Sequence, residues 1–216
     1  MILNDLASKY NTDKRLDIGQ NIYHGYTVKY ESLFSSIRTN KMNVLEIGVR
    51  EGSSHKMWEE YFENSIIYGV DNLSDPMITD EMKQQYIESL ETDRIKIFIG
   101  DQSDKDFMLS INKDLFDIII DDGSHRSWHQ QKTLNFMFDK LKSGGIYIIE
   151  DLGCCYGRDF REHDDILSST LHWLEHLRNG GTISYYVEDV QKLLSEIDSI
   201  ELCGELGIIR KRQMFI

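Results

Sequence analysis

Short apolar runs alternate with longer segments of helical pattern along most of the chain. The apolar runs are rich in β-branched residues, which is typical of strands that are covered on both faces. Longer segments separate these runs and have the spacing of helices. This alternation indicates an α/β fold with a mostly parallel sheet built from βαβ units. We expect strands at Asn43–Ile47, Ile66–Val70, Ile95–Ile99, Phe116–Ile120 and Ile146–Ile149.

The helices that connect the strands are predicted from the same pattern. They are expected at Ser54–Phe62, Asp80–Leu90, Asp104–Ile111 and Trp128–Leu141. The sequence LKSGG at the end of the last segment is read as a helix end with glycine at the cap. Beyond the fifth strand we expect helices at Asp164–Arg178 and Glu188–Ile197, and then an antiparallel hairpin around Gly204–Gly207.

Length and composition narrow the class of protein. The 216 residues, 40% of them hydrophobic, suit a single domain over residues 1–216, with residues 1–40 as an N-terminal helical cap on a core of residues 41–216. The net charge of −13 argues against a nucleic-acid partner. No membrane-length apolar run, secretory leader or disulfide framework is evident, so we expect a reduced, cytoplasmic protein with no membrane partner.

Glycines follow the first predicted strand. Gly48 and Gly52 frame a turn that leads into a helix beginning near Ser53. Glycines let the backbone approach a ligand closely, and a helix N-terminus presents free N–H groups. The G-x-G-x-x-G fingerprint is absent and Glu51 would repel a pyrophosphate, so NAD is disfavoured, whereas a nucleoside without phosphates could bind. A plain strand-to-helix turn is the alternative.

Acidic and amide side chains follow the second and third strands. In open α/β sheets, ligands bind beyond the carboxyl ends of the strands. Asp71 is placed to accept hydrogen bonds from ribose hydroxyls, and Asp101 and Gln102 could bind an adenine edge. Capping of a helix or turn is the alternative for Asp71, and helix capping by Ser103 or Asp101 is the alternative at the third strand.

Four carboxylates follow the fourth and fifth strands. Asp121 and Asp122 end one strand, and Glu150 and Asp151 end the other. If these strands are neighbours, about 4.8 Å apart, the carboxylates crowd one region and need protons, basic side chains or a metal ion to neutralise them. Carboxylate oxygens suit a hard cation, of which Mg²⁺ is the leading candidate. Helix capping and solvated loop charge are the alternative.

Successive residues of a strand point to opposite faces, so we do not expect both aspartates of the fourth strand to bind the ion. Gly123 lets the chain turn after Asp122, which makes Asp122 the better ligand and directs Asp121 to the cofactor. His125 could stand beside the ion as a general base. His129, one helical turn further on, is expected to be structural.

With these residues in view, the chain resembles the class I S-adenosylmethionine-dependent methyltransferases. Within them it is similar to the magnesium-dependent sugar O-methyltransferases of the macrocin and mycinamicin type. The glycine loop VLEIGVREGSSHKMW is shared by many methyltransferases, whereas DDGSH followed by YIIEDL is specific to this group. The segments LASKYNTDK, HGYTVKYESLF and GDQSD extend the resemblance over most of the chain.

The resemblance implies a Rossmann-like fold, S-adenosylmethionine and Mg²⁺ as cofactors, and methyl transfer to a sugar hydroxyl. It implies that Asp122, Glu150 and Asp151 bind the metal and that His125 is the base, in agreement with the reading of the residues themselves. Both lines of reasoning together predict cofactor binding by Glu46, Gly48, Gly52, Ser53, Asp71, Asp101, Gln102 and Asp121.

The acceptor is expected to be a small-molecule sugar with vicinal hydroxyls that chelate the metal. A nucleotide-linked sugar for surface polysaccharide and a natural-product glycoside both fit, and a homo-oligomer stays open. Two other functions stay open as well. A metal-independent small-molecule N- or O-methyltransferase would resist EDTA, and a noncatalytic adenosine-binding protein would bind the cofactor without turnover.

Overall fold

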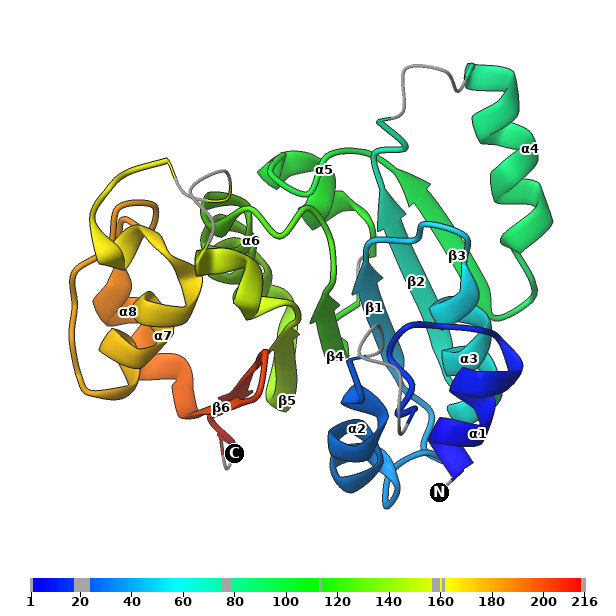
Figure 1. The fold of residues 1–216 in the computed structure, drawn as a ribbon, viewed down its shortest axis with the longest axis horizontal. Helices are drawn as coiled ribbons and strands as arrows, with labels where there is room; N and C mark the ends of the chain where they lie inside the picture. Colours follow the sequence, from blue (N-terminus) through cyan, green and yellow to red (C-terminus); the bar gives the residue numbers. More distant parts are fainter. Residues whose placement is uncertain are drawn as a thin grey trace. The chain divides into compact units, whose positions relative to one another are not determined.

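The computed structural model describes residues 2–17, 24–74, 79–112, 114–156, 160 and 162–214. The chain divides into two compact units, Met1–Ile99 and Gly100–Ile216. The first runs from blue through cyan to green in Figure 1, and the second from green to red. Among the described helices, none is both long enough and apolar enough to cross a membrane.

The first unit alternates helices with strands. In chain order its elements are α1 (Ile2–Lys9), α2 (Tyr26–Phe34), β1 (Asn43–Ile47), α3 (Ser53–Tyr61), β2 (Ile66–Asp71), α4 (Asp80–Leu90) and β3 (Ile95–Ile99). β2 pairs in parallel with both β1 and β3. Ile47 lies opposite Val70 and Asp71 lies opposite Ile99, so the carboxyl ends of these strands share one edge.

An aromatic cluster attaches helix α2 to the rest of the first unit. Tyr30 and Phe34 of α2 contact Trp58 of α3 and the following Phe62, with ring centroids 5.3 Å apart for Tyr30 and Trp58 and 5.5 Å for Phe34 and Phe62. All four side chains are fully buried. Such pairs add roughly 0.5–1.5 kcal/mol each beyond the burial of their area. Two helices, α1 and α2, are therefore present in the N-terminal forty residues, and the aromatic cluster packs α2 on α3.

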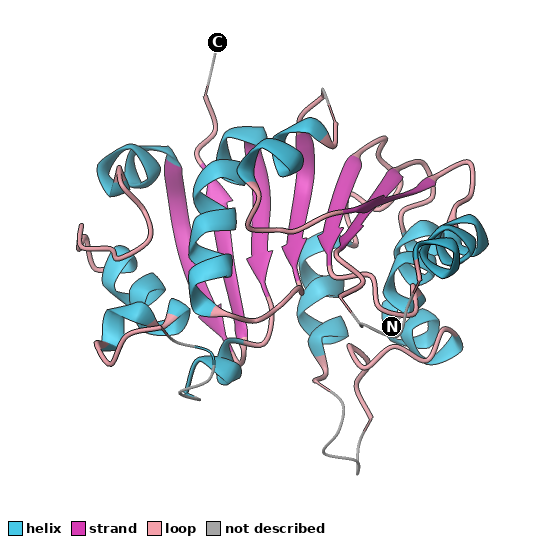
Figure 2. Ribbon diagram, turned by 90° about the horizontal axis from the view of Figure 1, so that it is seen from above, coloured by secondary structure: helices cyan, strands magenta, loops and turns pink. Residues whose placement is uncertain are grey.

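The second unit contains the remaining strands. In chain order its longer elements are α5 (Lys105–Ser110), β4 (Phe116–Asp121), α6 (Ser127–Met137), β5 (Leu141–Ile149), α7 (Thr170–Arg178), α8 (Val190–Glu196), β6 (Ile197–Cys203) and β7 (Leu206–Lys211). β4 and β5 are parallel neighbours, with Asp121 opposite Ile149, so the condition for the expected crowding of their carboxylates is met. β7 pairs in antiparallel fashion with both β5 and β6. The parallel pairs of both units, with helices beside them in Figure 2, and the C-terminal hairpin confirm the predicted α/β class.

The helix predicted at Trp128–Leu141 is wrong at its end. α6 stops at Met137, a 3₁₀ turn spans Phe138–Lys140, and β5 begins at Leu141. Leu141 lies opposite Phe116 and Ile146 lies opposite Ile118, so the residues between them form an irregularity in the strand. Gly144 has a φ of 77° there. The glycine pair therefore allows a bulge in a strand and does not end a helix.

The helix predicted at Asp164–Arg178 is also shorter than expected. A 3₁₀ turn at Ile166–Ser168 comes first, and α7 begins at Thr170.

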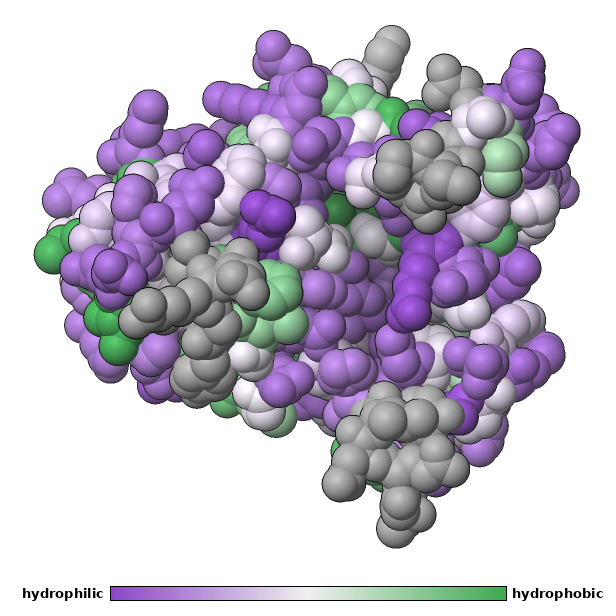
Figure 3. All heavy atoms as spheres, turned by 45° about the horizontal axis from the view of Figure 1, so that its top comes forward, coloured by the Kyte–Doolittle hydropathy of each residue, from purple (hydrophilic) through white to green (hydrophobic). Residues whose placement is uncertain are grey.

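On the face drawn in Figure 3, hydrophilic residues cover most of the described surface. This distribution agrees with the high charge content of the chain, of which 28% is Asp, Glu, Lys or Arg.

Candidate functional site

The turn after β1 is held in shape by the carboxylate at the end of β2. Gly48 and Gly52 have φ angles of 96° and 72°, in the left-handed region that glycine adopts without strain. Oδ2 of Asp71 accepts hydrogen bonds from the backbone N–H groups of Val49 (2.8 Å) and Arg50 (3.0 Å). Three residues predicted to bind the cofactor therefore belong to one local arrangement of the first unit.

The helix that follows this turn begins where the sequence predicted. Ser53 is the first residue of α3, and Gly52 precedes it without any side-chain cap. Oδ1 of Asp71 accepts a further hydrogen bond from the N–H of Leu73 (2.9 Å). Asp71 thus orders the chain on both sides of the strand edge, and binding of ribose hydroxyls by this carboxylate stays a prediction.

Glu46 of β1 is a fully buried carboxylate with polar partners from three parts of the first unit. Its Oε2 accepts a hydrogen bond from Oγ of Ser54 (2.6 Å) and lies 3.2 Å from Nδ1 of His55. Its Oε1 lies 3.3 Å from Nζ of Lys14, whose side chain is 2% exposed. The Glu46 carboxylate therefore joins β1 to the first turn of α3, across the glycine turn.

His55 takes no charge in this cluster near neutral pH. Its side chain is fully buried, and burial lowers the pKa of His55 from its ordinary value of 6.5, although the nearby Glu46 opposes the shift. Since a neutral imidazole offers one N–H, Nδ1 is the nitrogen placed to donate to Glu46. Lys14, on the other side of the carboxylate, is an ion-pair partner of Glu46 that was not predicted from the sequence.

In the second unit, Asp121 ends β4 as a buried carboxylate. Its Oδ1 accepts a hydrogen bond from Nε2 of Gln102 (3.1 Å), and its Oδ2 accepts one from the hydroxyl of Tyr147 (3.4 Å). Burial raises the pKa of Asp121 to about 6, against the opposing effect of the Gln102 bond. The structure brings together two predicted cofactor residues, Asp121 and Gln102, and their contacts with the cofactor stay predictions.

Gln102 also orders the loop that follows β4. Its Oε1 accepts a hydrogen bond from the backbone N–H of Ser124 (2.8 Å). Asp101 accepts hydrogen bonds from the backbone N–H and the hydroxyl of Ser103, at 2.8 Å each. Asp104 caps α5, so Asp101 forms a local turn and is not the helix cap that was considered for it.

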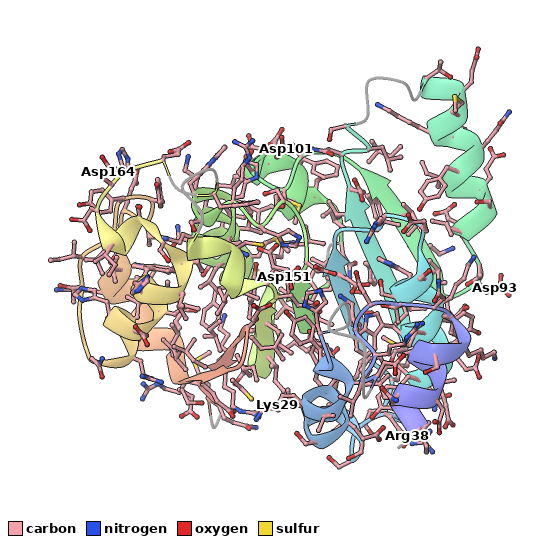
Figure 4. The ribbon with its side chains drawn as sticks, in the orientation of Figure 1. Lys29, Arg38, Asp93, Asp101, Asp151 and Asp164 are labelled. Carbon is pink, nitrogen blue, oxygen red and sulfur yellow. The ribbon has the colours of Figure 1, made fainter. Side chains whose placement is uncertain are left out.

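Asp122 is the residue on which the predicted metal ligands converge. A carboxylate oxygen of Asp122 lies within 4.8 Å of one of Glu150, and likewise within 4.8 Å of ligand atoms of His125 and Asp151. The backbone N–H of Glu150 donates to the carbonyl of Asp121 (3.0 Å), which holds the ends of β4 and β5 together. Figure 4 labels Asp151 just beyond β5.

His125 stands beside these carboxylates. Its Nε2 lies 3.5 Å from Oδ2 of Asp151, and the two side chains are 25% and 17% exposed. His125 has a φ of 55°, which is unusual for a residue other than glycine. His125 is therefore a partly buried imidazole whose Nε2 points to the acidic group.

His129 has a different environment. Its Nδ1 lies 2.6 Å from Oγ of Ser124, and burial lowers the pKa of His129. This contact favours the structural interpretation of His129.

The donor set of the second unit suits a hard divalent cation. Asp122, Glu150 and Asp151 offer carboxylate oxygens, and Glu150 is only 1% exposed. A buried carboxylate beside other acids is costly unless a positive charge compensates it. Because oxygen ligands of this kind are those that Mg²⁺ takes in proteins, the predicted ligands fit the predicted metal.

Comparisons with known proteins identify relatives of one kind. The chain is 33% identical over 172 residues to demethylmacrocin O-methyltransferase of Streptomyces fradiae, covering 76% of this chain and 39% of that protein. It is 34% identical over 167 residues to mycinamicin VI 2''-O-methyltransferase of Micromonospora griseorubida, covering 73% and 38%. The chain thus spans less than half the length of these curated relatives. No protein-family model matches it.

The fold agrees with these relatives. MycE methyltransferase from the mycinamycin biosynthetic pathway, solved in complex with Mg and SAH, superposes with a TM-score of 0.79 at 26% identity. The match covers 99% of this chain and 55% of that chain. A second structure of the same enzyme, with Mg, SAH and mycinamycin VI, gives a TM-score of 0.78 at 25% identity. The predicted resemblance is confirmed in both sequence and fold.

Proposed function

Because the chain has the fold of the class I S-adenosylmethionine-dependent methyltransferases and resembles their sugar O-methyltransferases, we propose that it methylates a sugar hydroxyl. S-adenosylmethionine is the methyl donor and Mg²⁺ is the metal, as suggested by the Mg and SAH of the MycE complexes. The acceptor is a small-molecule sugar with adjacent hydroxyls, either a natural-product glycoside or a nucleotide-linked sugar.

The residues that would hold the methyl donor belong to two groups. In the first unit, Gly48 and Gly52 shape the turn that leads into α3, and Asp71 lies at the adjoining strand end. In the second unit, Gln102 and Asp121 form a buried hydrogen-bonded pair. We assign ribose recognition to Asp71 and a supporting role at the adenine to Gln102.

The residues that would hold the metal are Asp122, Glu150 and Asp151. When bound, Mg²⁺ would raise the acidity of a coordinated hydroxyl and fix its orientation. His125 would accept the proton of that hydroxyl at Nε2, the nitrogen that faces Asp151. The hydroxyl oxygen forms the new bond to the methyl carbon, the bond from sulfur to that carbon breaks, and S-adenosylhomocysteine leaves.

The observation that supports this proposal most directly is the convergence of Asp122 with Glu150, His125 and Asp151 at distances within 4.8 Å. A noncatalytic adenosine-binding protein would not need a histidine base next to carboxylates that can bind a metal ion. A metal-independent methyltransferase has no need of the three carboxylates.

The test is an assay of the purified chain with S-adenosylmethionine, Mg²⁺ and a panel of nucleotide sugars and natural-product glycosides. Mass spectrometry should detect the gain of one methyl group on one class of acceptor, and EDTA should abolish it. Turnover that persists in EDTA would show that the reaction does not require a metal ion. Cofactor binding by calorimetry without turnover on any vicinal diol would favour the noncatalytic alternative.

A further inference from the structure

Helix α6 carries an unusual number of buried polar side chains. Ser127, Gln130, Gln131 and Thr133 are all 0% exposed. Polar side chains are seldom fully buried, and those that are need hydrogen-bond partners. The sequence gives no sign of this burial, since a polar helix is usually read as a surface helix.

Each of these side chains forms a hydrogen bond with the backbone of a neighbouring segment of the second unit. Oγ1 of Thr133 donates to the carbonyl of Gln102 (3.1 Å), and Nε2 of Gln131 donates to the carbonyl of Ser168 (3.2 Å). Oγ of Ser127 accepts from the N–H of Thr170 (3.2 Å). α6 thus acts as a rigid element to which the surrounding loops of the second unit are attached.

Gln130 makes the bond that reaches the metal-ligand segment. Its Nε2 donates to the carbonyl of Glu150 (3.3 Å), which belongs to the peptide that joins Glu150 to Asp151. Asp151 has a φ of 56°, a strained conformation for a residue with a Cβ. Such a conformation persists only where the surroundings fix it.

We propose that Gln130 is a positioning residue for the metal site, an inference that rests on the proposed function. Its side chain anchors the Glu150–Asp151 peptide to α6, so that both carboxylates project toward Asp122. Oε1 of Gln130 is buried without a hydrogen-bond partner among the described residues. What distinguishes Gln130 is its amide N–H₂ group, which holds the carbonyl between two predicted ligands.

The next residue provides a matched control. Gln131 is equally buried, also donates one hydrogen bond to a backbone carbonyl, and also has an Oε1 without a partner among the described residues. Its acceptor is Ser168, which is not a predicted ligand. Methionine replaces glutamine at similar volume, so Gln130→Met and Gln131→Met remove equivalent bonds.

The experiment compares Mn²⁺ binding to the metal-free wild type and to the two variants, by electron paramagnetic resonance. We expect Gln130→Met to bind Mn²⁺ about 10- to 100-fold more weakly, the range found when residues that orient metal ligands are lost. Gln131→Met should bind like the wild type, within about twofold on the same scale. Thermal unfolding should show a similar loss of stability in both variants.

Equal Mn²⁺ affinity of Gln130→Met and wild type, or equal weakening in both variants, would overturn the positioning role. Gln130→Asn, which keeps the amide but withdraws it from the carbonyl, provides the same comparison if the methionine variant does not fold. A wild type that binds no Mn²⁺ would instead reject the metal site of the proposed function. The two failures are therefore distinguishable.

Discussion

Nε2 of His125 lies 3.5 Å from Oδ2 of Asp151, and both residues have left-handed backbone conformations, with φ angles of 55° and 56°. Each follows one of the neighbouring strands β4 and β5. A left-handed conformation costs roughly 1–2 kcal/mol for a residue with a Cβ. Two such residues that face each other indicate that the fold accepts strain in order to place this pair, as is common at functional sites.

Replacement of His125 should therefore affect turnover far more than binding. For His125→Ala we expect turnover to fall by about 10²- to 10⁴-fold, the usual contribution of a general base. The affinity for S-adenosylhomocysteine, measured by calorimetry, should stay unchanged because His125 is not among the predicted cofactor residues. His172→Ala, on α7, is the control and should retain activity. Full activity of His125→Ala would exclude the role of base.

Removal of the buried cation next to Glu46 should destabilise the first unit. Lys14→Met leaves a fully buried carboxylate without this partner, and loss of one member of a buried ion pair typically costs about 3–5 kcal/mol. Urea unfolding should show this loss. The double variant Lys14→Met with Glu46→Gln should recover much of it, since no buried charge remains.

Lys9 offers the matched comparison. It forms an ion pair with Glu60 at 2.5 Å, but the two side chains are 55% and 42% exposed. Water screens such a pair, so Lys9→Met should change the stability much less than Lys14→Met. Equal effects of the two substitutions would show that the burial of Lys14 does not determine its contribution.

Strands are the part of the fold that the sequence predicts best. The bounds expected for β1 and β3 agree with the structure residue for residue, because each is a short, mostly apolar run whose residues are buried or half-buried. The start of β5 was missed, because LKSGG has the composition of a helix end. Only the pairing of Leu141 with Phe116 shows that the segment already belongs to the strand.

The sequence predicts those residues of the candidate site that directly follow the end of a strand. Asp122 and Glu150 approach each other because β4 and β5 are neighbours, a pairing that the sequence analysis took as a condition. Lys14 and Gln130 could not be identified in this way. Each is polar and lies in a polar segment, and its burial depends on packing between segments that are distant in the sequence.

The remaining prediction concerns acid stability and His55. Because burial lowers the pKa of His55 below 6.5, the unfolded chain binds its proton at a higher pH than the folded chain does. The stability contributed by neutral His55 is therefore complete above pH 6.5 and decreases as the pH falls toward the lowered pKa of the folded state. A single group of this kind changes the free energy of unfolding by at most about 1.4 kcal/mol per pH unit.

His55→Asn keeps a donor for Glu46 but does not titrate, so its urea-unfolding free energy should fall less steeply than that of the wild type on acidification through this range. Parallel curves for the two proteins would mean that His55 already accepts its proton in the folded cluster at its ordinary pKa.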